Sequence, residues 1–135
     1  MKVDNAIQPT ADQARATLKS TSREPVIMIN LLRFKPVATY PNGEQTTGKI
    51  AYGRYAAGFD KLLTPRGGRT IYSGSVERLM IGACEDLWDA VLVVEYPSAQ
   101  DFSEILRSDA YSEISIHREA GLAGQLNIET SKWDV

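Results

Sequence analysis

The chain has 135 residues, of which 43% are hydrophobic, and its 15 Lys and Arg against 17 Asp and Glu give a net charge of −2. A chain of this length is expected to bury one substantial hydrophobic core. The two signs of charge are mixed along the sequence, with no basic stripe and no basic amphipathic segment, so we expect neither nucleic acid nor a membrane surface as a partner.

Localisation and metal chemistry are predicted from what the sequence lacks. Residues 1–10 contain no apolar stretch of the kind found in signal peptides, and the longest apolar run, residues 26–32, is too short to span a membrane. One cysteine, Cys84, and one histidine, His117, form neither a disulfide nor a zinc site of the usual spacing. No cofactor motif is present. We therefore expect a cytoplasmic protein without metal or cofactor.

A short helix is predicted near the N-terminus. Thr10 to Gln13 has the form of a capping box, and Ala14 and Leu18 follow at helical spacing. The helix is expected to end near Ser20, inside an N-terminal extension that spans residues 1–24.

The next predicted elements are a strand, a long loop and a helix. Residues 26–34 form a nearly continuous apolar, β-branched run, which is typical of a strand covered on both faces. Residues 35–48 are rich in Pro, Asn, Gly and Thr and indicate a long loop. Residues 49–63 carry apolar side chains at intervals of three and four, which predicts an amphipathic helix.

The second half of the chain predicts two strands, a broken helix and a final strand. Residues 69–81 indicate a strand that bends at Gly74, and residues 90–96 indicate a buried strand antiparallel to it. A helix is expected after Pro97, broken at Ser108 and Asp109 and ending near Gly121. Residues 125–130 alternate apolar and polar side chains, as a half-buried strand does.

This order of elements, β-α-β-β-α-β, predicts an α+β fold with a ferredoxin-like antiparallel sheet and both helices on one face. The domain is expected to span residues 25–135. Because two strands are apolar on both faces, the face without helices needs a cover, and a second copy of the same sheet would provide it. The sequence therefore predicts a homodimer.

Several short stretches together resemble the domain-of-unknown-function family 1330, over roughly residues 25–129. They are NLLRFK at Asn30–Lys35, AYGRY at Ala51–Tyr55, Gly67-Gly68, Trp88-Asp89, EYPS at Glu95–Ser98 and His117-Arg118. The resemblance implies the fold of the dimeric α/β barrels. Members of that superfamily include cofactor-free monooxygenases, haem-degrading enzymes and stress-responsive proteins, so the resemblance implies no single activity.

Two residues are the first candidates for chemistry. His117 is the natural general base of the chain, because histidine exchanges protons near neutral pH, although a helix-end histidine beside Arg118 also favours the helix dipole. Asn30 interrupts an apolar strand, and its amide must either bond to the protein or face a wet cleft. Both interpretations stay open for each residue.

Four further residues could shape a pocket. Trp88 and Asp89 open the strand at residues 90–96, where the indole would wall a cavity and the carboxylate would hold a basic side chain, or both would serve only the core and a turn. Tyr52 and Tyr55 lie on the buried stripe of the predicted helix, so packing is the first explanation for their rings. Their hydroxyl groups could still point into a cavity.

Arg33 and Arg69 are candidate anchors for an anion, since a guanidinium group offers a two-pronged donor to a carboxylate. The same residues often lie on the surface without a ligand. The first functional hypothesis is therefore a small-molecule site between sheet and helices, with oxygenase or isomerase chemistry that needs no cofactor. The second is a non-catalytic dimeric binding module or stress-related protein.

Overall fold

The computed structural model, which describes residues 1–134, confirms the predicted fold class and order of elements. Four antiparallel strands form one sheet in the order β4-β5-β1-β6. This is the strand order of the ferredoxin-like fold. The strands are β1 (Val26–Phe34), β4 (Arg69–Ser75), β5 (Ala90–Tyr96) and β6 (Leu122–Thr130).

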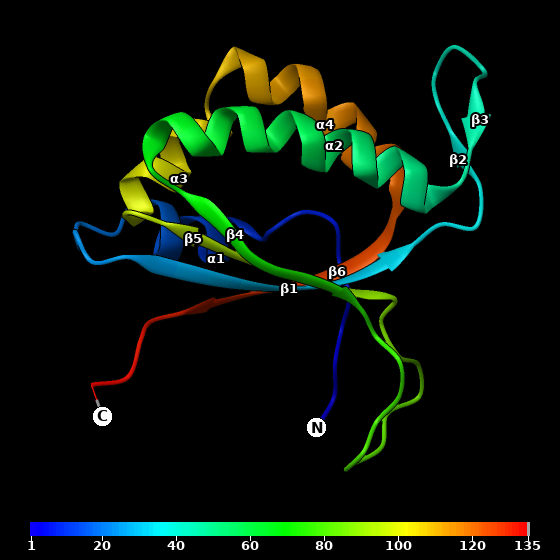
Figure 1. Cartoon of the computed structure of the whole chain (residues 1–135), viewed down its shortest axis with the longest axis horizontal. Helices are drawn as coiled ribbons and strands as arrows, with labels where there is room; N and C mark the ends of the chain where they lie inside the picture. The colour runs from blue at the N-terminus through cyan, green and yellow to red at the C-terminus, as the bar shows by residue number, and fades with distance from the viewer. Residues whose placement is uncertain (135) are drawn as a thin grey trace.

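The helices cover one face of this sheet (Figure 1). α2 (Gly48–Leu63) continues into a short 3-10 turn, Thr64–Arg66, and runs beside α4 (Asp109–Gly121). The predicted break in the second helix is present, because Arg107 and Ser108 separate α3 (Ala99–Leu106) from α4. No helix in the described part of the chain is long and apolar enough to cross a membrane.

The N-terminal helix, α1 (Ala11–Leu18), forms where the capping box predicts it. The Thr10 side chain accepts a hydrogen bond from the Gln13 backbone, and the Gln13 side chain accepts one from the Thr10 backbone. α1 contacts α3 and lies on the helix side of the sheet (Figure 1). The extension therefore covers part of the same face as the other helices.

The helix-facing side of the sheet holds the core. Alternate residues of β1 point to it, and Val26, Met28 and Leu32 are buried there against α2 and its neighbours. The buried stripe of α2 contains Tyr52, Tyr55, Phe59 and Leu63, as the spacing of three and four predicts.

The two long helices lie in close contact where two glycines meet. A Cβ atom on Gly48 would lie 2.1 Å from the Lys35 carbonyl oxygen and 2.7 Å from that of Gly121, and one on Gly121 would lie 2.6 Å from the Gly48 oxygen. Only glycine fits at either position. This contact fixes one end of the helix layer against the end of β1.

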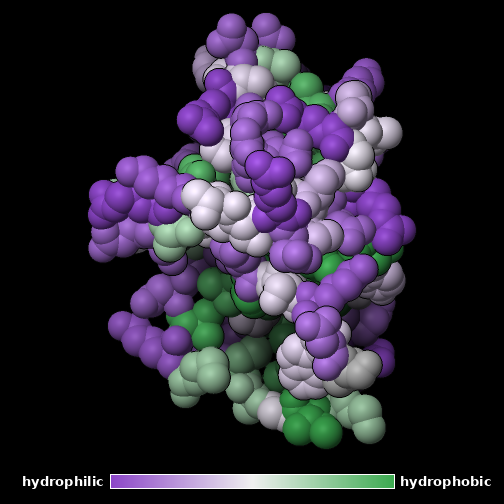
Figure 2. Space-filling view, turned by 90° about the vertical axis from the view of Figure 1, so that its left-hand side faces the viewer, coloured by the Kyte–Doolittle hydropathy of each residue, from purple (hydrophilic) through white to green (hydrophobic). Residues whose placement is uncertain are grey.

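The opposite side of the sheet has an aliphatic centre, and no helix of residues 1–134 covers it. Leu31 pairs with Val91 and Leu126, while Ile29 pairs with Val93 and Ile128. We call this side the outer face and define it by these six residues. The loop between β4 and β5 extends beyond it with Leu79, Met80 and Ile81 exposed at the tip. Figure 2 shows hydrophobic side chains gathered in its lower part, away from the helix layer.

The strand predicted at residues 69–81 is shorter than expected and is irregular at a different place. β4 ends at Ser75 because Ser75 pairs with Ala90, the first residue of β5, and residues beyond it have little strand to pair with. The register shifts between Thr70 and Tyr72 rather than at Gly74. Gly74 instead leaves room for the Tyr72 ring, since a Cβ there would lie 2.4 Å from the Tyr72 hydroxyl oxygen.

Two other boundaries differ from the prediction. The segment 35–48 contains a small hairpin, β2 (Ala38–Thr39) and β3 (Gln45–Thr46), whose turn includes Gly43 at a φ of 90°. β6 begins at Leu122, earlier than residue 125, because β1 keeps pairing with it beyond a register shift at Arg33 and Phe34.

Candidate functional site

A cavity of about 650 Å³ lies between the helix-facing side of the sheet and the helices. Its size falls within the range of small-molecule sites. The strand residues that line it are Met28, Asn30, Leu92, Val94, Tyr96, Gln125, Leu126, Asn127 and Ile128. The helix residues include Tyr52, Tyr55 and Phe59 of α2, Phe102 and Leu106 of α3, and Tyr111 and Arg118 of α4.

Aromatic rings form a continuous wall along this cavity. The Tyr52 and Tyr55 rings are 5.3 Å apart, and Tyr55 lies 5.6 Å from Phe59. The centroid of the Tyr96 ring lies 6.3 Å from that of Phe59, which it meets edge-on. It lies 4.6 Å from the centroid of Phe102, in a tilted arrangement. These separations are those of favourable aromatic pairs. The wall therefore suits an apolar, preferably aromatic, molecule.

Polar side chains from neighbouring strands gather at one end of the cavity. Asn30 Oδ1 accepts hydrogen bonds from Gln125 Nε2 at 2.6 Å and from Asn127 Nδ2 at 2.7 Å. Asn30 Nδ2 donates to the Leu92 carbonyl oxygen at 3.0 Å. We call Asn30, Gln125 and Asn127 the amide cluster. Leu92 and Tyr96 are four residues apart on β5, so the cavity extends roughly 13 Å from this cluster to the aromatic end.

Arg118 and Tyr52 flank the amide cluster. Arg118, in the last turn of α4, donates to Gln125 Oε1 at 2.7 Å. Tyr52 is only 7% exposed, yet its hydroxyl group makes no hydrogen bond to any residue from 1 to 134. Two donors from two helices therefore lie at the same end of the cavity.

Burial keeps the cavity tyrosines protonated. Loss of water around Tyr52 raises the pKa of its hydroxyl group to about 12, although the positive charge of Arg118 acts in the opposite direction. Burial also raises the pKa of Tyr55 and of Tyr96. At neutral pH these hydroxyl groups act as hydrogen-bond donors and not as anions.

The N-terminal extension covers the cavity from the side of β6. Ala6 N donates to the Gln125 carbonyl oxygen at 3.2 Å, and Thr17 Oγ1 donates to Glu129 Oε1 at 2.7 Å. Residues of this segment that line the cavity include Ile7, Pro9, Ala14, Thr17 and Leu18. The extension thus contributes part of the wall.

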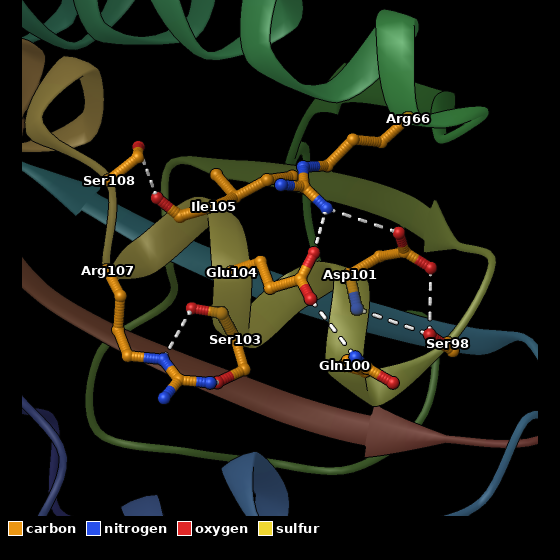
Figure 3. Close-up of polar contacts among 9 residues, drawn as sticks. All are labelled: Arg66, Ser98, Gln100, Asp101, Ser103, Glu104, Ile105, Arg107 and Ser108. Atoms are coloured by element: carbon orange, nitrogen blue, oxygen red, sulfur yellow. Dashed lines mark hydrogen bonds and ion pairs between the residues drawn. The ribbon is translucent and has the colours of Figure 1, made fainter.

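Polar contacts fix the short helix α3, which carries Phe102 and Leu106 (Figure 3). Ser98 caps its N-terminus by accepting from Asp101 N at 3.2 Å, and Arg66 forms ion pairs with Asp101 and Glu104. Because Arg66 belongs to the turn after α2, these ion pairs join α3 to α2 on the cavity's aromatic side. Hydrogen bonds from Arg66 and then from Gln100 also hold the pKa of the Glu104 carboxyl below its usual range.

Three of the residues singled out from the sequence come together at the cavity: Asn30, Tyr52 and Tyr55. Asn30 is both bonded to the protein and part of the cavity lining, so its two interpretations coexist. Tyr55 packs in the aromatic wall, and its hydroxyl oxygen lies 3.5 Å from that of Tyr111.

The remaining candidates lie away from the cavity lining. Arg33 pairs with the exposed Asp86 at 3.4 Å, and the exposed Arg69 pairs with the largely covered Glu95 at 2.8 Å. Asp89 Oδ2 accepts from Phe34 N at 2.8 Å, which ties the start of β5 to the end of β1.

The indole of Trp88 is occupied elsewhere. Trp88 Nε1 donates to Asn5 Oδ1 at 2.7 Å, so the ring contacts the N-terminal extension. This contact holds the indole outside the cavity lining.

His117 lies on α4 but does not line the cavity. Its Nδ1 atom is 2.6 Å from the Tyr40 hydroxyl oxygen, and the two rings meet edge-on. Arg54 stacks over the Tyr40 ring at 5.4 Å and pairs with Glu44 at 2.9 Å. His117 therefore joins α4 to the small hairpin at residues 38–46.

Sequence reasoning did not single out Arg118, Gln125 or Asn127. The signal was present, because Gln125 and Asn127 alternate with Leu126 and Ile128 in the final strand. That alternation predicts two faces but not which one is covered by helices. In the structure the register places Gln125 and Asn127 on the helix-facing side with Asn30 and Leu32, and Leu126 and Ile128 on the other side with Leu31 and Ile29, although the cavity lining also reaches Leu126 and Ile128.

Comparison with known proteins places the chain in a family. The model of the domain of unknown function DUF1330 matches residues 44–129, and the chain belongs to that family. The crystal structure of methylated RPA0582 protein has 34% sequence identity and a TM-score of 0.85, covering 96% of each chain. RPA0582 from Rhodopseudomonas palustris, described as a protein of unknown function, has 30% identity and a TM-score of 0.88 over 98% of this chain and 100% of its own.

More distant structures share the fold alone. A dimeric protein of unknown function and ferredoxin-like fold from Bacteroides fragilis has 10% identity and a TM-score of 0.53, over 80% of this chain and 96% of its own. Hydroxynitrile lyase from Passiflora edulis has 12% identity and a TM-score of 0.57, over 84% and 98%. A search of curated proteins finds no match to the chain.

Proposed function

We propose that the protein binds a small organic molecule with an apolar, largely aromatic body in the cavity between sheet and helices. One observation carries the proposal: buried Tyr52 and Tyr96 line a cavity of about 650 Å³ with hydroxyl groups that make no hydrogen bond within residues 1–134. No fully buried side-chain oxygen or nitrogen of residues 1–134 lacks a hydrogen-bond partner, so these two hydroxyl groups are open to the cavity, where a ligand would accept hydrogen bonds from them.

Binding is better supported than base-catalysed chemistry. A general base works best when its pKa is near the working pH, and the pKa of Tyr52 is raised to about 12. Asp4 is the carboxylate of the described chain that lines the cavity, and its side chain is exposed on the N-terminal segment. His117 reaches Tyr40 instead. Oxygenase or isomerase chemistry would therefore need the ligand itself to supply reactivity.

The test is fluorescence titration with N-phenyl-1-naphthylamine, a neutral probe that brightens in apolar surroundings. Wild type is expected to bind it, and Ala14→Trp is expected to weaken binding by about tenfold or more, because Ala14 lines the cavity and the indole would fill it. Ala11→Trp is the matched control, since Ala11 is exposed on the same helix. No binding to wild type, or equal binding to both variants, would contradict the proposal.

We also propose that the protein is a homodimer joined through the outer face. The support is physical: aliphatic pairs such as Leu31 with Leu126 and Ile29 with Val93 cover this face. At the nearby loop tip Met80 is 96% exposed and Ile81 is 85% exposed. Exposed apolar groups of this kind are typical of an interface, and a second copy presents the same complementary surface.

A further inference from the structure

The amide cluster has only one arrangement of hydrogen bonds that satisfies all its members. Arg118 has donors only, so the oxygen of Gln125 must face it, and the Gln125 nitrogen must then face Asn30. At the other end, the Leu92 carbonyl has acceptors only, so the nitrogen of Asn30 must face it. Both ends impose the same orientation on the amides, and the assignment is therefore secure.

This arrangement occupies the oxygens of Asn30 and Gln125 and leaves donors free, while the Asn127 oxygen keeps its acceptor capacity. Asn30 Oδ1 already accepts two hydrogen bonds, and Gln125 Oε1 accepts from Arg118. One hydrogen on the Gln125 nitrogen and one on the Asn127 nitrogen remain, together with other N–H groups of Arg118. The polar end of the cavity consequently offers more donors than acceptors.

Arg118 also lacks a charge partner. Within residues 1–134 no carboxylate oxygen lies within 4.0 Å of its guanidinium group, whereas Arg33, Arg54, Arg66 and Arg69 all have such partners. Arg118 is half-buried and lines the cavity. A partly buried charge without a partner is costly, and an anionic ligand would remove that cost.

Tyr52 adds a donor at the same place. Tyr52 lines the cavity, its hydroxyl group has no hydrogen-bond partner in the described chain, and the positive charge of Arg118 acts to lower the pKa of that hydroxyl group. A carboxylate can accept from an arginine and a hydroxyl group together.

We propose that the ligand of this cavity carries a carboxylate on its apolar body, and that Arg118 and Tyr52 bind the carboxylate at the end formed by the amide cluster. This inference rests on the proposed function and names the class of ligand. The distance from the cluster to Tyr96, roughly 13 Å along β5, leaves room for a two-ring body beyond the carboxylate.

The experiment compares two probes of the same shape by isothermal titration calorimetry: naphthalene-2-carboxylate and the neutral naphthalene-2-carboxamide. Wild type is expected to bind the carboxylate at least about tenfold more tightly. Arg118→Gln is expected to lose this preference while still binding the carboxamide, which also demonstrates that the variant is folded. Arg78→Gln, on the exposed β4–β5 loop, is the matched control and should keep the preference.

Tyr52→Phe provides a second, milder variant. It keeps the ring in the aromatic wall and is expected to weaken carboxylate binding by several-fold while leaving carboxamide binding unchanged. If Arg118→Gln binds neither probe, Tyr52→Phe decides, and equal weakening of both probes by that variant overturns the inference.

The outcomes separate the two proposals. If wild type binds both probes equally, the carboxylate inference is overturned and the cavity remains a binding site. If Arg118→Gln keeps the preference, the assignment to Arg118 is overturned. If wild type binds neither these probes nor N-phenyl-1-naphthylamine, the proposed function fails and the inference fails with it.

Discussion

The two faces of the sheet differ in two respects from those of an ordinary two-layer protein: the covered face has a polar cluster beside its apolar core, and the uncovered face has an aliphatic centre. The helix-facing side, which is covered, carries the polar residues Asn30, Gln125 and Asn127 beside a cavity. The outer face, which no helix covers, is lined with aliphatic side chains such as Leu31 and Val93. In a single soluble layer of helices on a sheet, the polar side chains would instead face outward.

This difference supports the two proposals, a ligand on the helix side and a second copy on the outer face. Buried amides are costly unless their bonding groups are satisfied, and uncovered aliphatic groups are costly in water. A small molecule on the helix side and a second copy on the outer face would remove both costs. Substitutions on either face test this view separately.

Val93→Lys on the outer face is expected to have the largest effect. A charge at the centre of an aliphatic interface would convert a dimer of twice 14.9 kDa into a monomer, because lysine in that interface would be desolvated without a partner. Sedimentation velocity measures the change. Val37→Lys, at an exposed valine of the 35–48 segment, should leave the mass unaltered. A dimer that survives Val93→Lys would show that the outer face is not the interface.

Gly48→Ala is expected to have the next largest effect, on the helix side. The new methyl group would meet the backbone of Lys35 and Gly121 and push α2 from α4, which should cost about 3 kcal/mol or more of unfolding free energy. Urea unfolding gives the value. Gly53→Ala has open space around it on the same helix and should stabilise the protein by about 0.5–1 kcal/mol. Similar midpoints for the two variants would contradict the close contact.

Asn30→Leu tests whether the amide cluster is a unit. It leaves the Gln125 and Asn127 nitrogens without their acceptor, and we expect a loss of about 2 kcal/mol in unfolding free energy. The double variant Asn30→Leu with Gln125→Leu should lose less than the sum of the single variants, since both partners are then apolar. Strict additivity in urea unfolding would indicate that the two side chains act independently.

The smallest expected effect at neutral pH is that of Tyr52, which changes only the alkaline stability. The folded-state pKa of Tyr52, about 12, is above the ordinary value of 10.0, so stability is unaffected below pH 10 and falls as the pH rises from 10 towards 12. Ionisation of Tyr52 alone is expected to lower the unfolding free energy by roughly 1.4 kcal/mol for each pH unit in that window. Tyr52→Phe should flatten the slope of stability against pH, measured by urea unfolding. An unchanged slope would mean that water reaches the hydroxyl group freely.

The sequence predicted the fold well because its signals were local. The capping box at Thr10, the apolar period of α2 and the break at Ser108 each specify their own element, and all three are present. The predicted end of β4 was wrong. The strand ends where its pairing with β5 ends, and that pairing joins residues that are distant in sequence. The hairpin inside the 35–48 segment was missed because two-residue strands leave almost no pattern.

The candidate site was harder to predict. Asn30 interrupts an apolar strand and Tyr52 lies on the apolar stripe of a helix, so both could be selected from the sequence. Both line the cavity. Arg118 and Gln125 could not be selected singly, because what marks them is the hydrogen bond that joins them between the end of α4 and β6. His117 was a candidate only because histidine can exchange protons near neutral pH, but its position on α4 directs its side chain to Tyr40.

The most direct test of the central claim is a crystal structure of the protein grown with naphthalene-2-carboxylate. We expect density between sheet and helices, with the rings beside Tyr55 and Phe59 and the carboxylate within hydrogen-bond distance of Arg118. We also expect a second copy on the outer face. A ligand bound on the outer face, or an empty cavity at saturating ligand, would contradict the assignment of the two faces.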